Sequence, residues 1–195
     1  MSYFGDAARY LIELLFGLYI LAVMLRLLLQ LARANFYNPL SQFLVQITNP
    51  PLVPLRRVIP GLGGIDVASV VLLLSLQMLE LVLIAAITPG QGSLPIASLL
   101  VLSLARLLRL VIYIYLVSIF IQIILSWVRP GDHSTLTGLL YSLNDPLLAP
   151  ARRLVPPISG LDLSPILVVV LLQLTLMLIV APLMDWGTTL ALTAS

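Results

Sequence analysis

The chain contains one segment twice. Seven Pro, Gly, Arg and Asp residues recur, without any gap, at a shift of 96 positions, as from Pro50 to Pro146. The first copy contains Pro50, Pro54, Arg56, Arg57, Pro60, Gly64 and Asp66, and the second contains Pro146, Pro150, Arg152, Arg153, Pro156, Gly160 and Asp162. Residues this restrictive rarely recur at one offset by chance, so the sequence predicts a tandem duplication.

The chain is too poor in charge to cover a water-facing surface. Hydrophobic residues make up 61% of it and charged residues 9%, whereas a soluble domain has roughly 45–50% apolar and about 25% charged residues. Its long apolar runs approach the roughly 20 residues that a helix needs to cross a bilayer. We therefore expect an all-α, multi-pass membrane protein with four transmembrane helices, at about residues 10–33, 67–87, 106–129 and 165–184.

An amphipathic stretch follows the first span of each repeat, at residues 38–48 and 134–144. Its apolar residues recur with helical spacing, i, i+3, i+4, i+7, as Leu40, Phe43, Leu44 and Ile47 and again as Leu136, Leu139, Leu140 and Leu143. This period predicts a short helix in the membrane interface, with its apolar face in the acyl chains. Asn38 and Ser134 are the expected N-caps.

A proline-rich stretch then leads to the second span. Proline removes a backbone donor and fixes φ, so we expect neither 50–60 nor 146–157 to be continuous helix. Gly64 and Gly160 permit the turn that comes next. The expected caps of the second spans are Asp66 in the first copy and Asp162 or Ser164 in the second.

Two spans per repeat give the repeats, 1–90 and 91–195, the same orientation in the membrane. The apolar segment 94–105 is too short for a span and is read as re-entrant or as an N-terminal extension of the third helix. Six arginines follow the first spans, against three at the opposite end, which favours cytoplasmic motif loops and external termini. The six are Arg33, Arg56, Arg57, Arg129, Arg152 and Arg153.

The pattern Asn/Asp-Pro-x-x-x-Pro-x-Arg-Arg-x-x-Pro-x-x-x-Gly-x-Asp between two spans resembles the YggT (YlmG) family of small membrane proteins. The second copy is closer to the family pattern, with Ser126-Trp127 before the amphipathic stretch and Ser164-Pro165 after the glycine. The resemblance implies a bacterial inner-membrane protein associated with osmotic-stress tolerance and cell division. Plastid relatives are associated with thylakoid protein assembly and nucleoid distribution, and the resemblance implies no established reaction.

The double arginines Arg56-Arg57 and Arg152-Arg153 allow two interpretations. At the depth of the lipid phosphates, they would bind anionic lipid or an acidic membrane-protein partner. Alternatively, they only fix the topology and pair with Asp66 or Asp162 within the loop.

Polar residues inside the spans are also duplicated: Arg26 matches Gln122, and Gln77 matches Gln173. Unsatisfied polar groups are costly in hydrocarbon, so we expect these four side chains to face one another in the bundle. They would line a path for an ion or small solute or, as we favour, hold the helices together by hydrogen bonds. We further expect Glu13 and Glu80 to pair with arginines, among Arg9, Arg106 and Arg109.

Enzymatic signals are weak, because the chain has one histidine, His133, and no cysteine. We expect no catalytic residue, metal site or cofactor, and no direct binding of nucleic acid. The leading hypothesis is a non-enzymatic inner-membrane scaffold or assembly protein whose Arg-Arg loops engage anionic lipid or an acidic partner. The alternative is an ion transport or channel component in osmotic response, which would require a homo-oligomer because four spans are few to enclose a pore.

Overall fold

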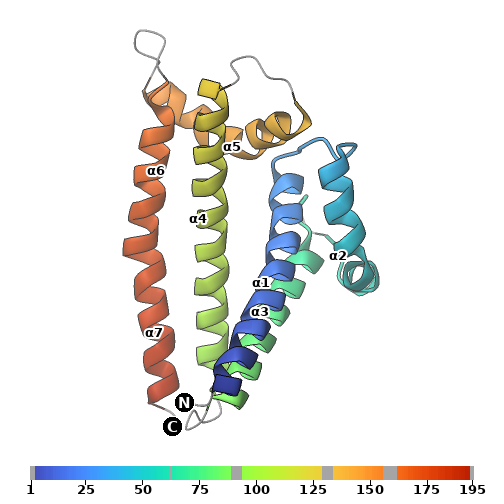
Figure 1. The fold of residues 1–195 in the computed structure, drawn as a ribbon, viewed down its shortest axis with the longest axis vertical. Helices are drawn as coiled ribbons and strands as arrows, with labels where there is room; N and C mark the ends of the chain where they lie inside the picture. The colour runs from blue at the N-terminus through green and yellow to red at the C-terminus, as the bar shows by residue number, and fades with distance from the viewer. Residues whose placement is uncertain (1–2, 62, 89–93, 129–133, 156–161, 194–195) are drawn as a thin grey trace.

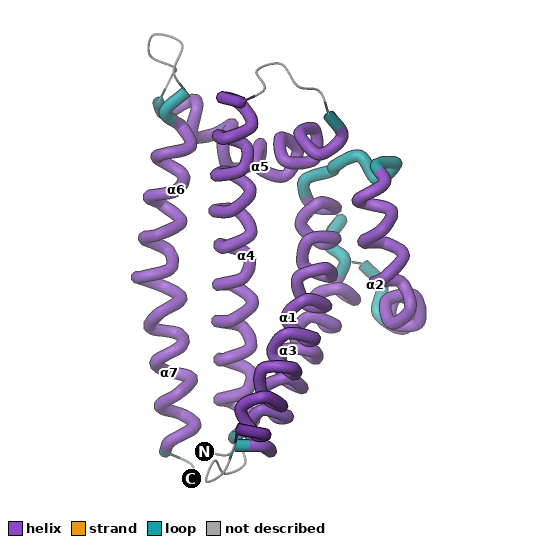
Figure 2. The backbone as a smooth tube through the Cα atoms, viewed as in Figure 1, coloured by secondary structure: helices purple, strands orange, loops and turns teal. Residues whose placement is uncertain are grey.

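The computed structural model describes residues 3–61, 63–88, 94–128, 134–155 and 162–193, and every element of these residues is a helix (Figures 1 and 2). The first repeat contains α1 (Tyr3–Leu31), α2 (Pro39–Val58) and α3 (Val67–Ile87). The second contains α4 (Ile96–Val128), α5 (Thr135–Leu154), α6 (Ser164–Thr175), the π-helical turn η1 (Leu176–Val180) and α7 (Ala181–Leu192).

Four helices among the described residues are long and apolar enough to cross a membrane, as predicted. They are α1, α3, α4 and the continuous α6–η1–α7. The 33 residues of α4 include most of 94–105, so this segment extends the third span and the re-entrant interpretation is wrong. The fourth span continues past Met184 to Leu192. It passes Pro182 through η1, where the Ala181 N–H donates to the Leu176 carbonyl, five residues back.

The prediction that the proline-rich segments interrupt the helix is wrong. α2 continues through Pro50, Pro51 and Pro54, and α5 continues through Pro146 and Pro150. A proline frees the carbonyl four residues earlier, but a neighbouring helix can supply the missing donor. In α2 the Tyr19 hydroxyl donates to the carbonyl of Ile47, four residues before Pro51, at 3.4 Å. Figure 1 shows that α2 bends sharply along its length.

α2 ends at the point where an extended residue precedes a proline. Ile59, the C-cap of α2, has φ −113° and ψ 100° because the residue before a proline avoids the helical region, here before Pro60. Gly63 and Gly64 then turn the chain with φ of +60° and +85°, which confirms the role predicted for Gly64. The second-copy equivalents, Pro156 and Gly160, lie outside the described residues.

Side chains at the helix starts explain where the helices begin. Asn38 and Ser134 accept backbone N–H bonds at the starts of α2 and α5, as predicted. Asp66 does the same for Ser69 in α3. In the second copy the predicted caps are wrong, because the N-cap of α6 is Leu163, which makes no side-chain capping bond. Asp162 instead accepts the Ser164 N–H at 2.9 Å.

The first spans α1 and α4 run in the same direction, and both second spans return antiparallel to them (Figure 1). α3 packs against both α1 and α4, and α7 packs against α4. The chain termini lie at one end of the bundle; α5 crosses the other end, while α2 descends beside α1 (Figure 1). The two repeats are therefore parallel, as the even number of spans predicted.

The amphipathic faces of α2 and α5 are only partly where the sequence analysis placed them. Leu139 and Leu143 of α5 lie in the main hydrophobic core with residues of α1 and α3, so they contact protein and not acyl chains. Their face has a neighbouring repeat to pack against. In α2 the equivalent of Leu139 is Phe43, which is 57% exposed.

Candidate functional site

The double arginines occupy the last turns of α2 and α5. A cation is favourable there because the last carbonyls of a helix carry a partial negative charge. The position also brings each pair back towards the aspartate that begins the following span. The continuous helices, which the sequence analysis missed, thus place the arginines.

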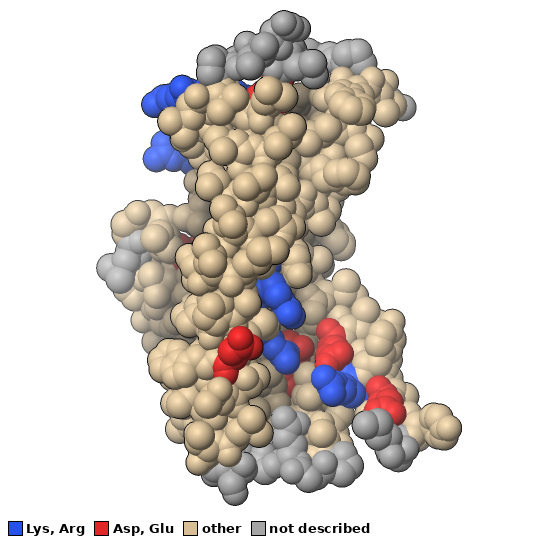
Figure 3. All heavy atoms as spheres, turned by 90° about the vertical axis from the view of Figure 1, so that its left-hand side faces the viewer, with Lys and Arg blue, Asp and Glu red and all other residues tan. Residues whose placement is uncertain are grey.

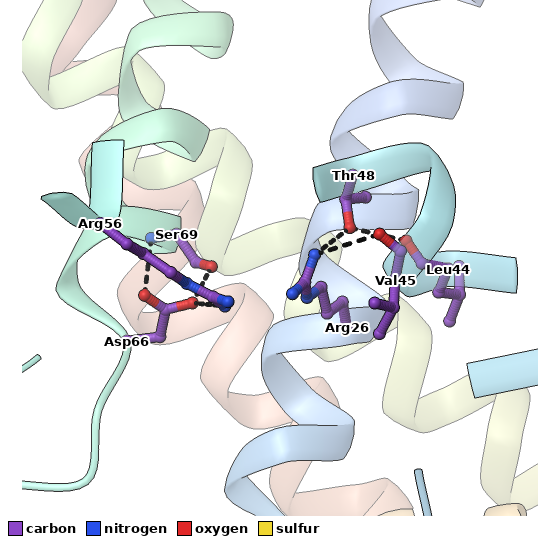
Figure 4. Close-up of polar contacts among 7 residues, drawn as sticks. All are labelled: Arg26, Leu44, Val45, Thr48, Arg56, Asp66 and Ser69. Carbon is purple, nitrogen blue, oxygen red and sulfur yellow. Dashed lines mark hydrogen bonds and ion pairs between the residues drawn. The ribbon is translucent and has the colours of Figure 1, made fainter. Parts of the chain in front are cut away.

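The first arginine of each pair is held by an aspartate ten residues later. Arg56 Nη2 donates to Asp66 Oδ2, which also accepts the Ser69 hydroxyl (Figure 4). In the second repeat, Arg152 Nε donates to Asp162 Oδ2 at 2.9 Å, and Asp145 lies 3.5 Å from the same guanidinium. The prediction of ion pairing within the loop therefore holds for this arginine.

Both aspartates are set to carry charge at neutral pH. Burial alone would raise the pKa of Asp66, but the bonds from Arg56 and Ser69 outweigh it and hold the pKa below its usual value. The pKa of Asp162 is lowered in the same way, because bonds from Ser164 and Arg152 outweigh its burial. Each pair is thus ionic, and each closes the segment between the interfacial helix and the second span.

The second arginine of each pair is differently placed. Arg57 and Arg153 are exposed, and neither makes an ion pair or side-chain hydrogen bond with the described residues. A free guanidinium presents a planar fork of donors that matches phosphate or carboxylate oxygens. The duplication therefore builds the same arrangement twice, with one arginine fixed and its neighbour available.

A pocket of about 520 Å³ lies beside the first of these sites, between α1, α2 and the turn before α3. Its polar lining includes two guanidinium groups, from Arg26 and Arg56, and one carboxylate, from Asp66. Figure 4 shows Arg26 and Arg56 approaching this region from different helices. The excess of one positive charge suits a small anionic group.

The intramembrane polar residues do not converge, which corrects the expectation that they face one another. Arg26 Nη1 donates to Thr48 Oγ1 at 2.6 Å and to the Val45 carbonyl at 3.4 Å, both in α2 (Figure 4). Gln122 Oε1 accepts from Asn144 Nδ2 of α5 at 2.7 Å. Each side chain therefore ties the first span of its own repeat to its interfacial helix.

Sequence reasoning missed the partners, Thr48 and Asn144, although a signal was available. They are equivalent by the same 96-residue shift that relates Arg26 to Gln122. A polar residue retained at matching positions of an otherwise apolar face marks an interhelical contact.

The other duplicated pair also separates. Gln77 is buried and donates to Glu80 at 2.7 Å, and Glu80 lies 3.6 Å from Arg106, which joins α3 to α4 across the two repeats. Gln173 is exposed and makes no side-chain hydrogen bond with the described residues. Arg9 pairs with Glu13 at 2.9 Å, so the predicted partners of both glutamates are confirmed.

On the face shown in Figure 3, acidic and basic side chains gather together in the half of the bundle nearer the chain termini. Ion pairs such as Arg9–Glu13 and Arg106–Glu80 belong to this end. The described residues contain no group of three His, Cys, Asp or Glu side chains that could hold a metal ion. His133 lies outside the described residues.

The chain is similar to several bacterial proteins along most of its length. It is 45% identical over 176 residues to uncharacterized protein PA0392 of Pseudomonas aeruginosa, covering 90% of this chain and 89% of that protein. It is 40% identical to a Vibrio alginolyticus protein from the proC 3' region, covering 86% and 90%. Protein YggT of Escherichia coli is 37% identical, covering 86% of each chain. No solved structure matches the chain.

The family comparison matches the duplication itself. The CCB3/YggT family matches residues 6–87 and again residues 101–183, one match in each repeat. Both matches contain a first span, an interfacial helix with its arginine pair, and a second span. The chain is therefore a member of the CCB3/YggT family that carries two copies of the family's repeat.

Proposed function

We propose that this chain is a non-enzymatic scaffold of the bacterial inner membrane that binds anionic lipid through Arg57 and Arg153. The observation that carries the proposal is that the two arginines of each pair are placed differently. Arg56 and Arg152 are held by aspartates, whereas Arg57 and Arg153 are exposed and unpaired among the described residues.

The chemistry of these positions favours a lipid phosphate as the ligand. A guanidinium binds phosphate through two parallel N–H bonds, and a basic group near an anionic leaflet contributes roughly 1 kcal/mol. Arg57 and Arg153 also end amphipathic helices, which suit the membrane interface. α5 crosses one end of the bundle and α2 descends beside α1 (Figure 1). In this proposal Arg153 and Arg57 both reach phosphates of the leaflet at that end, which the positive-charge bias favours as the cytoplasmic one.

The scaffold role follows from what the bound lipid would do. A chain held at two points along one leaflet offers a fixed platform on which membrane proteins can assemble. Osmotic tolerance or cell division, which the family resemblance implies, is the physiological setting of this proposal. The transport alternative has no comparable support, because Arg26, Gln77, Gln122 and Gln173 do not come together within the chain.

The test measures anionic-lipid enrichment around the purified protein. In bilayers containing phosphatidylcholine and spin-labelled phosphatidylglycerol, the immobilised fraction of labelled lipid should fall when Arg57→Gln and Arg153→Gln are combined. Arg109→Gln is the matched control, because it removes an exposed arginine from the half of α4 nearer the chain termini.

Two results would contradict lipid binding. In one, the double variant keeps the full preference for phosphatidylglycerol. In the other, Arg109→Gln lowers the preference for phosphatidylglycerol as much as the double variant does, which would show that the preference depends only on the net charge of the protein. A double variant that retains its lipid preference but loses a protein crosslink in native membranes would assign the arginines to an acidic protein partner instead.

A further inference from the structure

The two faces that pack together between the repeats each have an equivalent face elsewhere in the chain, and these equivalent faces are open. In the internal contact, the first span of repeat two, α4, packs against the second span of repeat one, α3. Because the repeats are equivalent, α1 carries a counterpart of the α4 face, and α6–η1 carries a counterpart of the α3 face. Neither counterpart has a repeat to pack against within the chain.

We call the α4 side of this contact, together with the adjoining surface of α5, the leading face. The burial of the leading face differs between the two repeats. Leu107 and Ile114 are 7% and 8% exposed within the main core, whereas their equivalents Leu11 and Leu18 are 55% and 58% exposed. Leu139 is 4% exposed and its equivalent Phe43 is 57% exposed. The equivalent positions are thus covered in repeat two and open in repeat one. The open leading face consists of Leu11, Leu14, Leu15, Leu18 and Phe43.

We call the α3 side of this contact, on the second span, the trailing face. The burial of the trailing face shows the reverse difference between the repeats. Gln77 and Leu81 of α3 are each 5% exposed. Their equivalents, Gln173 and Met177, are exposed, the latter by 64%. Here repeat one is covered and repeat two is open.

The energetic argument for a protein partner at the trailing face rests on Gln173. Lipid covers an exposed leucine as well as protein does, so apolar exposure in a span does not by itself require a partner. An amide is different, because a polar group in hydrocarbon is costly without a hydrogen bond. Gln173 is the tenth residue of α6, about 15 Å along a span that starts at Ser164, and has no side-chain bond to the described residues.

We infer that copies of this chain associate head to tail, with the leading face of one copy covering the trailing face of the next. The contact would repeat the internal α3–α4 packing between molecules. Such a heterologous contact closes into a ring or continues as a chain, depending on the rotation between copies. This inference is independent of lipid binding by Arg57 and Arg153, which lie in α2 and α5.

The internal contact supplies the positions for a crosslinking test. Arg106 lies 3.6 Å from Glu80 across the repeats, and the equivalent positions are Tyr10 and Leu176. The chain has no cysteine, so two introduced thiols would be the only ones. The full chain carrying Tyr10→Cys and Leu176→Cys is treated in native membranes with a short bis-methanethiosulfonate reagent, and products are resolved by mass.

We expect several-fold more crosslinked product than with the control pair Tyr10→Cys and Leu178→Cys. Leu178 is 71% exposed on the same turn of the span but two residues away, and thus on another face of the helix. A two-copy product and a longer ladder both support the head-to-tail contact, since partial crosslinking of a ring or of an open chain gives either one.

A mixture of two singly substituted proteins tests the direction of the contact. Tyr10→Cys mixed with Leu176→Cys should give a two-copy product, whereas either protein alone should not. The inference is overturned if the two cysteine pairs crosslink equally, if neither crosslinks, or if Tyr10→Cys crosslinks mainly to itself.

Discussion

The two repeats share a motif but bury opposite parts of it. In the second spans, 39% of the apolar stretch of α3 is buried, against 11% of that of α6–α7. In the interfacial helices the order reverses: Phe43 of α2 is 57% exposed, whereas Leu139 of α5 is 4% exposed. The difference comes from the neighbours. α3 has a second repeat beside it, and α5 has a first repeat beside it, while α2 and α6–α7 lie at the open ends of the array.

This comparison separates what a repeat encodes from what its neighbours add. The tie between the first span and the interfacial helix is present in both copies, as Arg26–Thr48 and as Gln122–Asn144. The arginine–aspartate closure is also present in both. These two contacts made within a repeat are therefore duplicated, whereas the contact between the repeats exists once. This is the behaviour expected of an array in which each unit packs only against its neighbours.

The largest expected difference between equivalent positions is at the apolar face of the interfacial helices. Leu139→Ala removes buried methyl groups from the main core and should lower the free energy of unfolding by about 2–5 kcal/mol. Phe43→Ala, at the open equivalent position, should change it by about 0.5 kcal/mol or less. Denaturant unfolding of the detergent-solubilised monomer measures both. Equal losses would show that burial does not follow the position of the repeat in the array.

The second prediction concerns the contact that holds the peripheral fourth span. Gly187 packs so closely on α4 that an added Cβ would lie 2.8 Å from Leu102 side-chain atoms, and its carbonyl accepts the Ser98 hydroxyl at 2.8 Å. Gly187→Val should therefore cost about 1–3 kcal/mol through overpacking. Gly17→Val is the control, because a Cβ there meets nothing within 4 Å. Thermal unfolding in detergent compares them, and a loss of the same size at Gly17 would refute a packing origin.

A third prediction distinguishes the two duplicated ties. Gln122→Leu leaves the buried Asn144 amide without its acceptor and should cost about 1–3 kcal/mol. Arg26→Leu should cost less, because the Thr48 hydroxyl still donates to the Leu44 carbonyl at 2.6 Å and a buried charge is removed. Denaturant titration of the two variants gives the order.

The double variant with Gln122→Leu and Asn144→Leu provides the check on this explanation. It should recover much of the stability lost by Gln122→Leu, since replacing both partners leaves no unpaired amide. Ser118, which donates to Asn144, can then bond only the Tyr115 carbonyl that it already contacts at 3.0 Å. A further loss in the double variant would contradict the unpaired amide as the cause.

The sequence predicted the elements that depend on local chemistry. Apolar runs located four spans, and Asn38, Ser134 and Asp66 marked helix starts, because a cap acts within a few residues. The helix through Pro51 could not be read locally, since the donor for the freed Ile47 carbonyl comes from Tyr19, on another helix.

The site shows the same limit. The four arginines and two aspartates were identified from the repeat, but which arginine is held depends on the direction in which a continuous α2 or α5 delivers each side chain. The exposure of Gln173 was equally hidden, because its equivalent Gln77 differs only in having a second repeat beside it. Matching the repeats can therefore predict contacts such as the arginine–aspartate pairs within each repeat. It cannot predict burial, which depends on whether a repeat has a neighbour on that side.

The smallest expected effect compares the two arginine–aspartate closures by pH. The pKa values of Asp66 and Asp162 are lowered in the folded chain, so each closure contributes stability above the unfolded pKa, about 3.9, and loses it as pH falls through the folded value. Asp66 is 6% exposed and Asp162 is 36% exposed. Water screens the more exposed pair, so Asp66→Asn should lower the unfolding temperature at pH 7 more than Asp162→Asn. The deficit of either variant should shrink below about pH 4, where the wild-type aspartates take up protons. Because an asparagine can also cap Ser69, the substitution removes the charge and not the cap, and a deficit that stays constant down to pH 3 would contradict the charge as its cause.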